Sequence, residues 1–261
     1  MGKIIAVVNQ KGGVGKTTTA VNLAAGVGIA GKKVLLVDAD PQGNSTSGFG
    51  INKKEVKTTS YELLIGTGKL ENAIVKTEYK NVDVVPSSMD LAAAEVDLIE
   101  IEHREAQLKM TLAASRDSYD YIFIDCPPSL GLLTINSLTA VDSVLIPIQC
   151  EFYALEGVSQ LMSTIDLVKK SMNKKLEIQG VILSMFDGRT NLSIQVVEEV
   201  KKYFKQKVYA TVIPRNVRLA EAPSYGLPIM EYDPKSMGAK AYMEFAEEFL
   251  ANENAKKRGK K

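Results

Sequence analysis

The stretch IIAVVNQKGGVGKTTT, residues 4–19, decides how the rest of this chain is organised. A short run rich in Ile and Val predicts a buried strand, the run breaks into a loop of glycines and lysines, and the next segment has helical spacing. Strand, glycine loop and helix in this order are the context in which a loop binds phosphate. Gly12, Gly13 and Gly15 allow backbone N–H groups to approach an oxyanion, and the positive end of the helix dipole adds to the attraction.

The side chains of the loop indicate which phosphates it holds. Lys16 offers a point charge to the β- and γ-phosphates of a nucleotide, and Thr17 offers a hydroxyl to Mg²⁺. The alternative is a glycine-rich turn with solvated lysines. It does not explain why the strand, the two lysines and the threonines follow one another in this spacing. We therefore predict ATP and Mg²⁺ as ligands, with nucleotide contacts from Gly12, Gly13, Val14, Gly15, Lys16, Thr17 and Thr18.

The loop departs from the usual pattern G-x-x-x-x-G-K-[ST] at its start. The first glycine of that pattern would fall on Gln10, and Lys11 follows. This form, KGGVGKTT, resembles the deviant loop of the ParA/MinD group of P-loop ATPases. The resemblance implies that the chain forms a homodimer with ATP sandwiched between the subunits. It also implies that Lys11 reaches across the interface to the phosphates of the partner's ATP and acts in catalysis together with Lys16.

Two more motifs place carboxylates after apolar strands. In VLLVDADPQG, residues 34–43, an uninterrupted apolar run ends at Asp38 and Asp40, where ligands bind in open α/β sheets. The resemblance gives Asp40 the catalytic role of polarising the attacking water and a place near the metal, with Asp38 in support; an Asp-rich turn before a proline is the alternative. In YIFIDCPPS, residues 121–129, an apolar run ends at Asp125, which is the Walker B arrangement. The resemblance implies that Asp125, like Asp40, holds Mg²⁺ through a water.

Apolar runs and amphipathic segments alternate along the chain, which predicts an α/β fold with a doubly wound, mostly parallel sheet of seven or eight strands. We expect a single P-loop NTPase domain over residues 1–254 and a basic, disordered tail over residues 255–261. Residues 44–57 are predicted to be a mobile surface loop, and residues 90–115 one or two surface helices. Later strands are expected at residues 81–86, 121–124, 143–150, 178–187 and 207–216, and longer helices at residues 16–30, 130–141, 154–172, 192–207 and 240–252.

Composition narrows the function further. A net charge of +1 over 261 residues gives no global attraction to nucleic acid, so DNA binding would need a local patch. Cys126 and Cys150 lack metal spacing and are expected to be buried hydrophobes in a reducing compartment. No apolar run approaches the ~20 residues of a membrane span, and a core strand follows MGK directly, so we expect a cytoplasmic protein without a signal peptide. His103, the sole histidine, is expected on a solvated helix face.

The resemblance extends over essentially the whole chain. The segments CPPSLGLLTINSL, QCEFYALEGVSQL and TVIPRNVRLAEAPSYGLPI resemble the chromosomal ParA/Soj partition ATPases, in the short form without an N-terminal helix-turn-helix segment. It implies slow ATP hydrolysis, stimulation by a ParB-type centromere-binding partner, non-specific binding to double-stranded DNA, and association with the nucleoid. Pro214 and Asn216 would contact the adenine. The candidate DNA contacts are Arg189, Arg218, Lys201 and Lys202, with ordinary solvated surface charge as the alternative.

Two other classes of function stay open at this point. A MinD-like membrane switch would need an amphipathic C-terminal helix, and the final segment EFLANENAKKRGKK is too polar to bury a face in lipid. A metabolic or electron-transfer relative, such as a cobyrinic-acid-type amidoligase or nitrogenase iron protein, is the third class. The iron protein needs cysteines that meet across a dimer axis, and Cys126 directly after the Walker B aspartate is not an expected cluster ligand.

Overall fold

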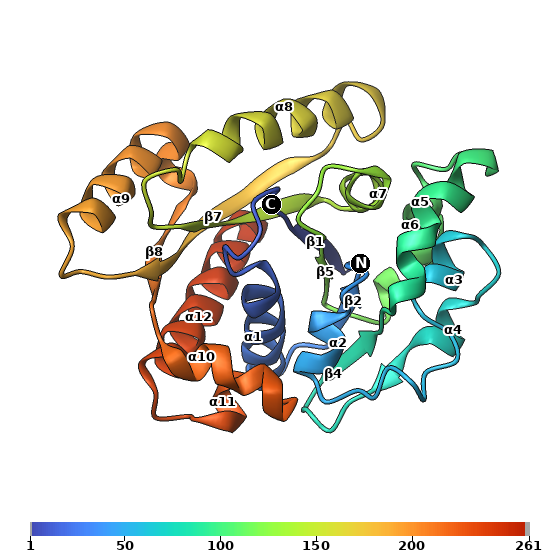
Figure 1. The fold of residues 1–261 in the computed structure, drawn as a ribbon, viewed down its shortest axis with the longest axis horizontal. Helices are drawn as coiled ribbons and strands as arrows, with labels where there is room; N and C mark the ends of the chain where they lie inside the picture. Colours follow the sequence, from blue (N-terminus) through green and yellow to red (C-terminus); the bar gives the residue numbers. More distant parts are fainter. Residues whose placement is uncertain (1, 259–261) are drawn as a thin grey trace.

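An eight-stranded sheet runs through the computed structural model, which describes residues 2–258 (Figure 1). The strand order is β3-β4-β2-β5-β1-β6-β7-β8, and every pair is parallel except β3 with β4. This confirms the doubly wound, mostly parallel sheet. The strands are β1 (Lys3–Val7), β2 (Val34–Asp38), β3 (Val75–Lys76), β4 (Val82–Val85), β5 (Tyr121–Asp125), β6 (Ser143–Gln149), β7 (Glu177–Phe186) and β8 (Val208–Pro214).

Helices cover both faces of the sheet (Figure 1). One face is covered by α1 (Lys16–Ile29), α10 (Val217–Glu221), α11 (Ile229–Tyr232) and α12 (Met237–Arg258). The other face is covered by α3 (Ser60–Leu64), α4 (Leu70–Ala73), α5 (Ala94–Asp97), α6 (Gln107–Leu112), α7 (Leu132–Ala140), α8 (Glu156–Ser171) and α9 (Asn191–Phe204). The short helix α2 (Asn44–Gly48) follows β2.

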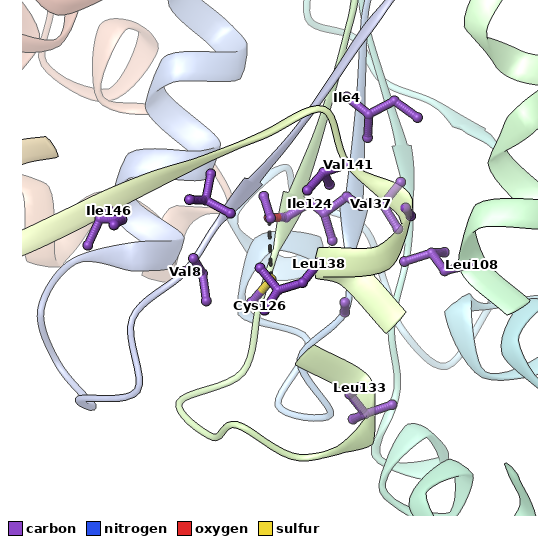
Figure 2. Close-up of a cluster of buried hydrophobic side chains, with 14 of the residues drawn as sticks. Ile4, Val8, Val37, Leu108, Ile124, Cys126, Leu133, Leu138, Val141 and Ile146 are labelled. Atoms are coloured by element: carbon purple, nitrogen blue, oxygen red, sulfur yellow. Dashed lines mark hydrogen bonds between the residues drawn. The ribbon is translucent and has the colours of Figure 1, made fainter. Parts of the chain in front are cut away.

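Alternating side chains of the strands build two cores. On β1, Ile4 and Ala6 join the cluster under α7 and α8, whereas Ile5 and Val7 join the cluster under α1 and α12. Figure 2 shows the first cluster, in which Cys126 is packed among apolar side chains, with its thiol 3.9 Å from the carbonyl oxygen of Ile124. Cys126 and Cys150 are both buried and unbonded to each other, as expected of small hydrophobes.

The carboxyl ends of β1, β2 and β5 meet at one edge of the sheet. In the register, Asp125 lies opposite Val7 on one side and opposite Asp38 on the other. The chain runs from β1 outward to β2 on one side and later to β6 on the other, so the loop after β1 opens at the point where the strand order reverses. This is where open α/β sheets bind ligands.

The predicted mobile loop over residues 44–57 is partly wrong. Its first residues form α2, which begins after Gly43 in a left-handed conformation (φ 61°). Ser45 and Thr46 are fully buried, because their hydroxyls donate hydrogen bonds to carboxylates at the ends of β5 and β2. Small polar residues are typical of loops, but here they bury against charged partners that are distant in sequence.

The expectation of one or two surface helices over residues 90–115 also needs correction. The segment is broken into the helices α5 and α6 and the 3₁₀ turns η1 (Met89–Ala93), η2 (Leu98–Glu100) and η3 (Ala113–Asp117). His103 interrupts it with a left-handed backbone (φ 54°). Its side chain is exposed, as predicted. The breaks let Leu91, Leu98 and Leu108 all bury against one core, which one straight helix would not allow.

The prediction that residues 255–258 belong to a disordered tail is wrong, because these residues are helical. Helix α12 continues to Arg258, and residues 259–261 lie outside the described part of the chain. The helix is held by Glu253, whose carboxylate pairs with Lys3 at 2.9 Å, and basic residues at its carboxyl end are favoured by the helix dipole. Within residues 2–258, no helix combines the length and apolar character of a membrane-crossing segment.

Candidate functional site

The glycine loop between β1 and α1 adopts the backbone conformation that its sequence predicts. Gly13 and Gly15 are both left-handed (φ 74° and 89°), where a residue with a Cβ would be strained. Apart from the glycine and its two chain neighbours, no atom of the described residues lies within 4 Å of where a Cβ would stand on Gly12 or Gly13, so this side of the loop is open. Gly15 is the N-cap of α1 and has no side chain to satisfy the N–H groups of the first turn. These N–H groups are available to an anion.

Lys16 lies inside the loop rather than in solvent. It is 6% exposed, and its ammonium group donates a hydrogen bond to the carbonyl oxygen of Lys11 at 2.9 Å. Burial lowers the pKa of Lys16, against the opposing influence of Asp125, Cys126 and Asp40. A buried ammonium group that has only a carbonyl oxygen to bind would be stabilised by a phosphate group in the loop.

Lys11 points away from its own loop. Its ammonium group forms an ion pair with Glu151, which follows β6, and both side chains are about one-third exposed. Its backbone N–H donates to Asn9 Oδ1 at 3.1 Å, and the Asn9 side chain donates in turn to the carbonyl oxygen of Pro147 at 2.8 Å. The start of the loop is thereby fixed to β6.

Two carboxylates lie side by side at the ends of β2 and β5, and both are fully buried. Asp38 accepts hydrogen bonds from the N–H and hydroxyl of Thr46, at 2.8 and 2.7 Å, and from the N–H of Asp40 at 3.2 Å. Asp125 accepts one from Ser45 at 2.5 Å through Oδ2, whereas its Oδ1 has no hydrogen-bond partner among residues 2–258. The carboxylate of Asp38 is therefore satisfied by hydrogen bonds, whereas Asp125 has a buried oxygen that could bind a cation.

The pKa shifts of Asp38 and Asp125 also favour a cation beside these carboxylates. Burial raises the pKa of both carboxyl groups, and each is raised further by a neighbouring carboxylate: Asp38 acts on Asp125, and Asp40 acts on both. The hydroxyl groups of Ser45 and Thr17 partly offset the rise for Asp125. Negative charge here is costly without a cation, and the oxygens of Asp125 and Thr17 are the hard ligands that Mg²⁺ prefers. The residues present fit a magnesium ion.

Asp40 is 6% exposed and lies in the turn after β2. Its Oδ1 accepts the N–H of Gln42 at 2.9 Å. The structure thus brings Asp40, Asp125, Thr17 and Lys16 to one edge of the sheet, as the three sequence motifs predict.

A cavity of about 330 Å³ lies beside the loop. Pro214 and Asn216, predicted to contact a base, both line it. The side chain of Asn216 also caps α10, accepting the N–H of Arg218 at 2.9 Å. The remaining lining residues are Gly15, Thr18, Ser184, Met185, Ile213, Arg215, Val217, Leu219, Ala220 and Tyr242.

Several of these lining residues were missed by the sequence reasoning. Ser184 and Met185 come from the end of β7, and a polar residue at the carboxyl end of a predicted strand was the available signal. Tyr242 comes from the second turn of α12, and no local pattern indicates that it reaches the cavity.

The four basic residues proposed for DNA do not form one cluster. Arg189 and Arg218 follow the carboxyl ends of β7 and β8, on the same edge of the sheet as the loop. Lys201 and Lys202 are exposed in the last turn of α9, which runs ~21 Å back to the opposite edge. The lysines are therefore separate from the arginines. Arg215, which was not predicted, is exposed on the edge that carries the arginines.

Each of the two predicted arginines has an acidic partner. Arg189 forms two hydrogen bonds with Asp187, at 2.9 and 2.7 Å, which lower the pKa of that carboxyl group to about 2 with a further contribution from Arg215. Arg218 pairs with Glu221 at 2.9 Å and with Asp233 at 3.4 Å.

Comparison with known proteins agrees with the fold and the site. A family model described as an AAA domain matches residues 2–178. The chain is 60% identical over 252 residues to the sporulation initiation inhibitor protein Soj of Bacillus subtilis, covering 97% of this chain and 100% of that protein. It is 49% identical over 253 residues to the chromosome-partitioning ATPase Soj of Treponema pallidum, covering 97% and 99%.

A solved structure supports the same fold. Cobyrinic acid a,c-diamide synthase from Mycobacterium smegmatis, with bound ADP and magnesium, matches with a TM-score of 0.83 and 38% identity, covering 95% of this chain and 93% of that one. The fold is thus that of the P-loop NTPases, and the two sequence matches each cover 97% of this chain. On this evidence the chain belongs to the ParA/Soj family of chromosome-partitioning ATPases.

Proposed function

We propose that this protein is a Mg-ATP-dependent switch that forms a nucleotide-sandwich homodimer and binds double-stranded DNA non-specifically. It hydrolyses ATP slowly, a ParB-type partner stimulates it, and the cycle drives chromosome or plasmid segregation on the nucleoid in the cytoplasm. The observation that carries the nucleotide part is the arrangement at the loop. The ammonium group of Lys16 is buried, Asp125 has an oxygen without a partner among the described residues, and Gly15 and Thr18 of the same segment line a cavity of about 330 Å³. Similarity to named partition ATPases supports the cellular role.

The residues of the site divide the chemistry among them. The N–H groups of the loop and the Lys16 ammonium group hold the phosphates, while Pro214 and Asn216 hold the base. Asp40 orients the attacking water, and Thr17 and Asp125 hold the metal. No group of three or more His, Cys, Asp or Glu in the described residues could hold a metal alone, which suits an ion that keeps waters and phosphate oxygens as ligands. When bound, Mg²⁺ neutralises charge on the β- and γ-phosphate oxygens.

The pairing of Lys11 with Glu151 supports a slow basal rate. A lysine held by a carboxylate of its own chain must leave it before it can reach a phosphate in a partner subunit. In the dimer this lysine would act as an arginine finger does, a contribution that reaches ~10³–10⁵ in rate where it is fully engaged. Formation of the dimer and catalysis are thus coupled through one side chain.

DNA binding is proposed for the carboxyl edge of the sheet, because Arg189, Arg215 and Arg218 follow strands that end there. Carboxylates pair with two of these arginines, so a monomer offers few free phosphate contacts. Two subunits double the number, and each added contact steepens the dependence of log K on log salt by about 0.9. The nucleotide would therefore switch DNA binding through the dimer.

The test is a gel shift on non-specific duplex DNA without nucleotide, with ADP, with ATP and with a non-hydrolysable ATP analogue, across a salt series. Light scattering on the same samples gives the oligomeric state. We expect dimers and tight, salt-sensitive DNA binding with ATP and its analogue alone. A protein that stays monomeric with the analogue, or binds DNA equally without nucleotide, would contradict the proposal.

A further inference from the structure

The hydroxyl group of Ser184 is buried between the end of β7 and the glycine loop. Ser184 is 3% exposed, and its Oγ donates a hydrogen bond of 2.7 Å to the carbonyl oxygen of Val14. The two residues are 170 positions apart in sequence. Its own carbonyl oxygen accepts the N–H of Cys150 at 3.0 Å, so the serine is held firmly in the sheet.

Val14 occupies the most adaptable part of the loop. It lies between Gly13 and Gly15, both left-handed. Turning over the peptide unit between Val14 and Gly15 would change the sign of the φ angle of Gly15, and glycine adopts both signs about equally well. The glycines that allow the loop its shape therefore also allow this peptide to point the wrong way.

A hydrogen bond to the Val14 carbonyl removes that freedom. A trans peptide unit is planar, so its C=O and N–H point in opposite directions. Holding the Val14 oxygen against β7 therefore directs the Gly15 N–H away from β7. Ser184 also contacts the loop from the side, since its Cβ lies 3.8 Å from the Cβ position of Gly15.

Ser184 also lines the cavity assigned to the base, next to Met185. Met185 has a left-handed backbone (φ 52°), which is unfavourable for a residue with a side chain, and the pairing of β7 with β8 shifts register between Leu183 and Phe186. The same short segment of β7 thus lines the base cavity and holds the phosphate loop.

We propose that Ser184 is a positioning residue for the nucleotide, because it fixes the Val14–Gly15 peptide so that the Gly15 N–H is ready for a phosphate oxygen. Its hydrogen bond also connects the segment of β7 that lines the base cavity to the phosphate loop. The inference rests on the proposed ATP binding. It predicts that the hydroxyl contributes to the binding affinity of ligands that carry phosphates. It should not contribute to the affinity of adenosine, which would occupy only the base cavity.

The experiment measures the affinities of ATP, ADP and adenosine, and the KM and kcat of hydrolysis, for the wild type, Ser184→Ala and Ser184→Thr. Ser143→Ala is the matched control, because Ser143 is equally buried on the neighbouring strand β6 and its hydroxyl lies 3.1 Å from Gln179 Oε1. Ser143 pairs with Glu177 at the start of β7, so it lies near the other end of the sheet. We expect Ser184→Ala to weaken ATP and ADP binding roughly 3- to 30-fold, the effect of losing one buried hydrogen bond and the order it imposes. KM should rise with kcat nearly unchanged, because ground state and transition state lose the same contact.

Adenosine binding should not change in Ser184→Ala, and Ser184→Thr, which keeps the hydroxyl, should bind ATP within about threefold of the wild type. A purely structural role would instead reduce the active fraction and leave KM unaltered. If Ser184→Ala does not fold, Ser184→Cys keeps the size of the side chain with a weaker donor and should show an intermediate loss of ATP affinity.

Normal ATP and ADP affinities in folded Ser184→Ala, or in Ser184→Cys where that variant is used, would overturn the inference and leave the proposed function intact. An equal loss of adenosine binding would overturn it as well. If the wild type and Ser143→Ala fail to bind ATP, the proposed function fails, and this inference fails with it.

Discussion

At the scale of single residues, the site depends on charges buried without their final partners. Lys16 binds only a backbone carbonyl, and Asp125 keeps one oxygen unpaired among the described residues. Buried charges are costly unless they are paired or bind an ion, so both are explained by a ligand that carries negative phosphates and a cation. Asp38, by contrast, has its hydrogen bonds filled by Thr46 and Asp40 and needs no ligand.

Lys16→Ala should abolish ATP-dependent dimerisation. We expect ATP affinity to fall by about 100-fold or more, because charge-assisted hydrogen bonds of roughly 1.5–3 kcal/mol each are lost at two phosphate groups. Calorimetry with ATP and light scattering with the non-hydrolysable analogue measure the two effects. Lys54→Ala, an exposed lysine, is the control and should resemble the wild type. If Lys16→Ala still formed dimers with the analogue, the assignment of the glycine loop as the phosphate-binding site would be contradicted.

Asp40→Ala should separate binding from hydrolysis. The loop and Lys16 still hold the phosphates, so the variant should bind ATP and dimerise. Without the group that orients water, kcat should fall roughly 10²- to 10⁴-fold. A phosphate-release assay measures turnover, and light scattering on the same sample verifies the dimer. Turnover at the wild-type rate would mean that another group orients the water.

At the scale of elements, α12 links the two ends of the chain through a buried polar cluster. Glu253, 3% exposed, binds Lys3 on β1 and Gln179 on β7, with distances of 2.8–2.9 Å. Nearer the start of the same helix, Tyr242 lines the cavity beside the glycine loop, and its hydroxyl lies 3.1 Å from that of Thr19 in α1. The cluster therefore helps to position α12 and, with it, the side chain of Tyr242.

Glu253→Gln should destabilise the fold by about 1–3 kcal/mol, because Lys3 loses its charged partner while staying largely buried. Burial raises the pKa of Glu253, but hydrogen bonds from Lys3 and Gln179 more than offset this, so its pKa lies below the ordinary value. A depressed pKa means that the stabilisation is present above the pKa of the unfolded chain and is lost as the pH falls through the folded value.

The measurement for this variant is urea unfolding across a pH series. The difference between wild type and Glu253→Gln should be full at neutral pH and should shrink below the ordinary glutamate pKa of about 4.3. Glu247→Gln, an exposed position on the same helix, should show no such difference. A pH-independent difference would assign the effect to packing rather than to charge.

At the scale of the whole molecule, the parallel sheet determines which side chains can act together. Every segment that follows a parallel strand emerges at one edge, so the loop, the carboxylates and the arginines after β7 and β8 share that edge. Lys201 and Lys202 lie at the far end of α9, although they are close to Arg189 in sequence. A single basic surface made of all four residues is therefore not available in one subunit.

Arg189→Ala should weaken DNA retention in the ATP state without changing ATP-dependent dimerisation. A lost phosphate contact in each of two subunits should reduce the salt slope of log K by about 1.8 in total. The matched variant Lys201→Ala, on the opposite edge, should keep DNA binding closer to that of the wild type. Gel shifts across a salt series compare the DNA affinities of the two variants. A larger loss of affinity in Lys201→Ala than in Arg189→Ala would place the DNA-binding surface at the end of α9.

The sequence by itself determined the strand–loop–helix unit, the positions of Asp40 and Asp125 after buried strands, and the class of fold. Glycine conformations, apolar runs and strand ends are local properties, so short patterns encode them. Only the tertiary structure decided that Ser45 and Thr46 bury against carboxylates, that Ser184 and Tyr242 line the cavity beside the glycine loop, and that the lysines of α9 lie apart from the arginines. These outcomes depend on which distant segments meet when the sheet closes, and no local pattern contains that information because the partners lie many residues away.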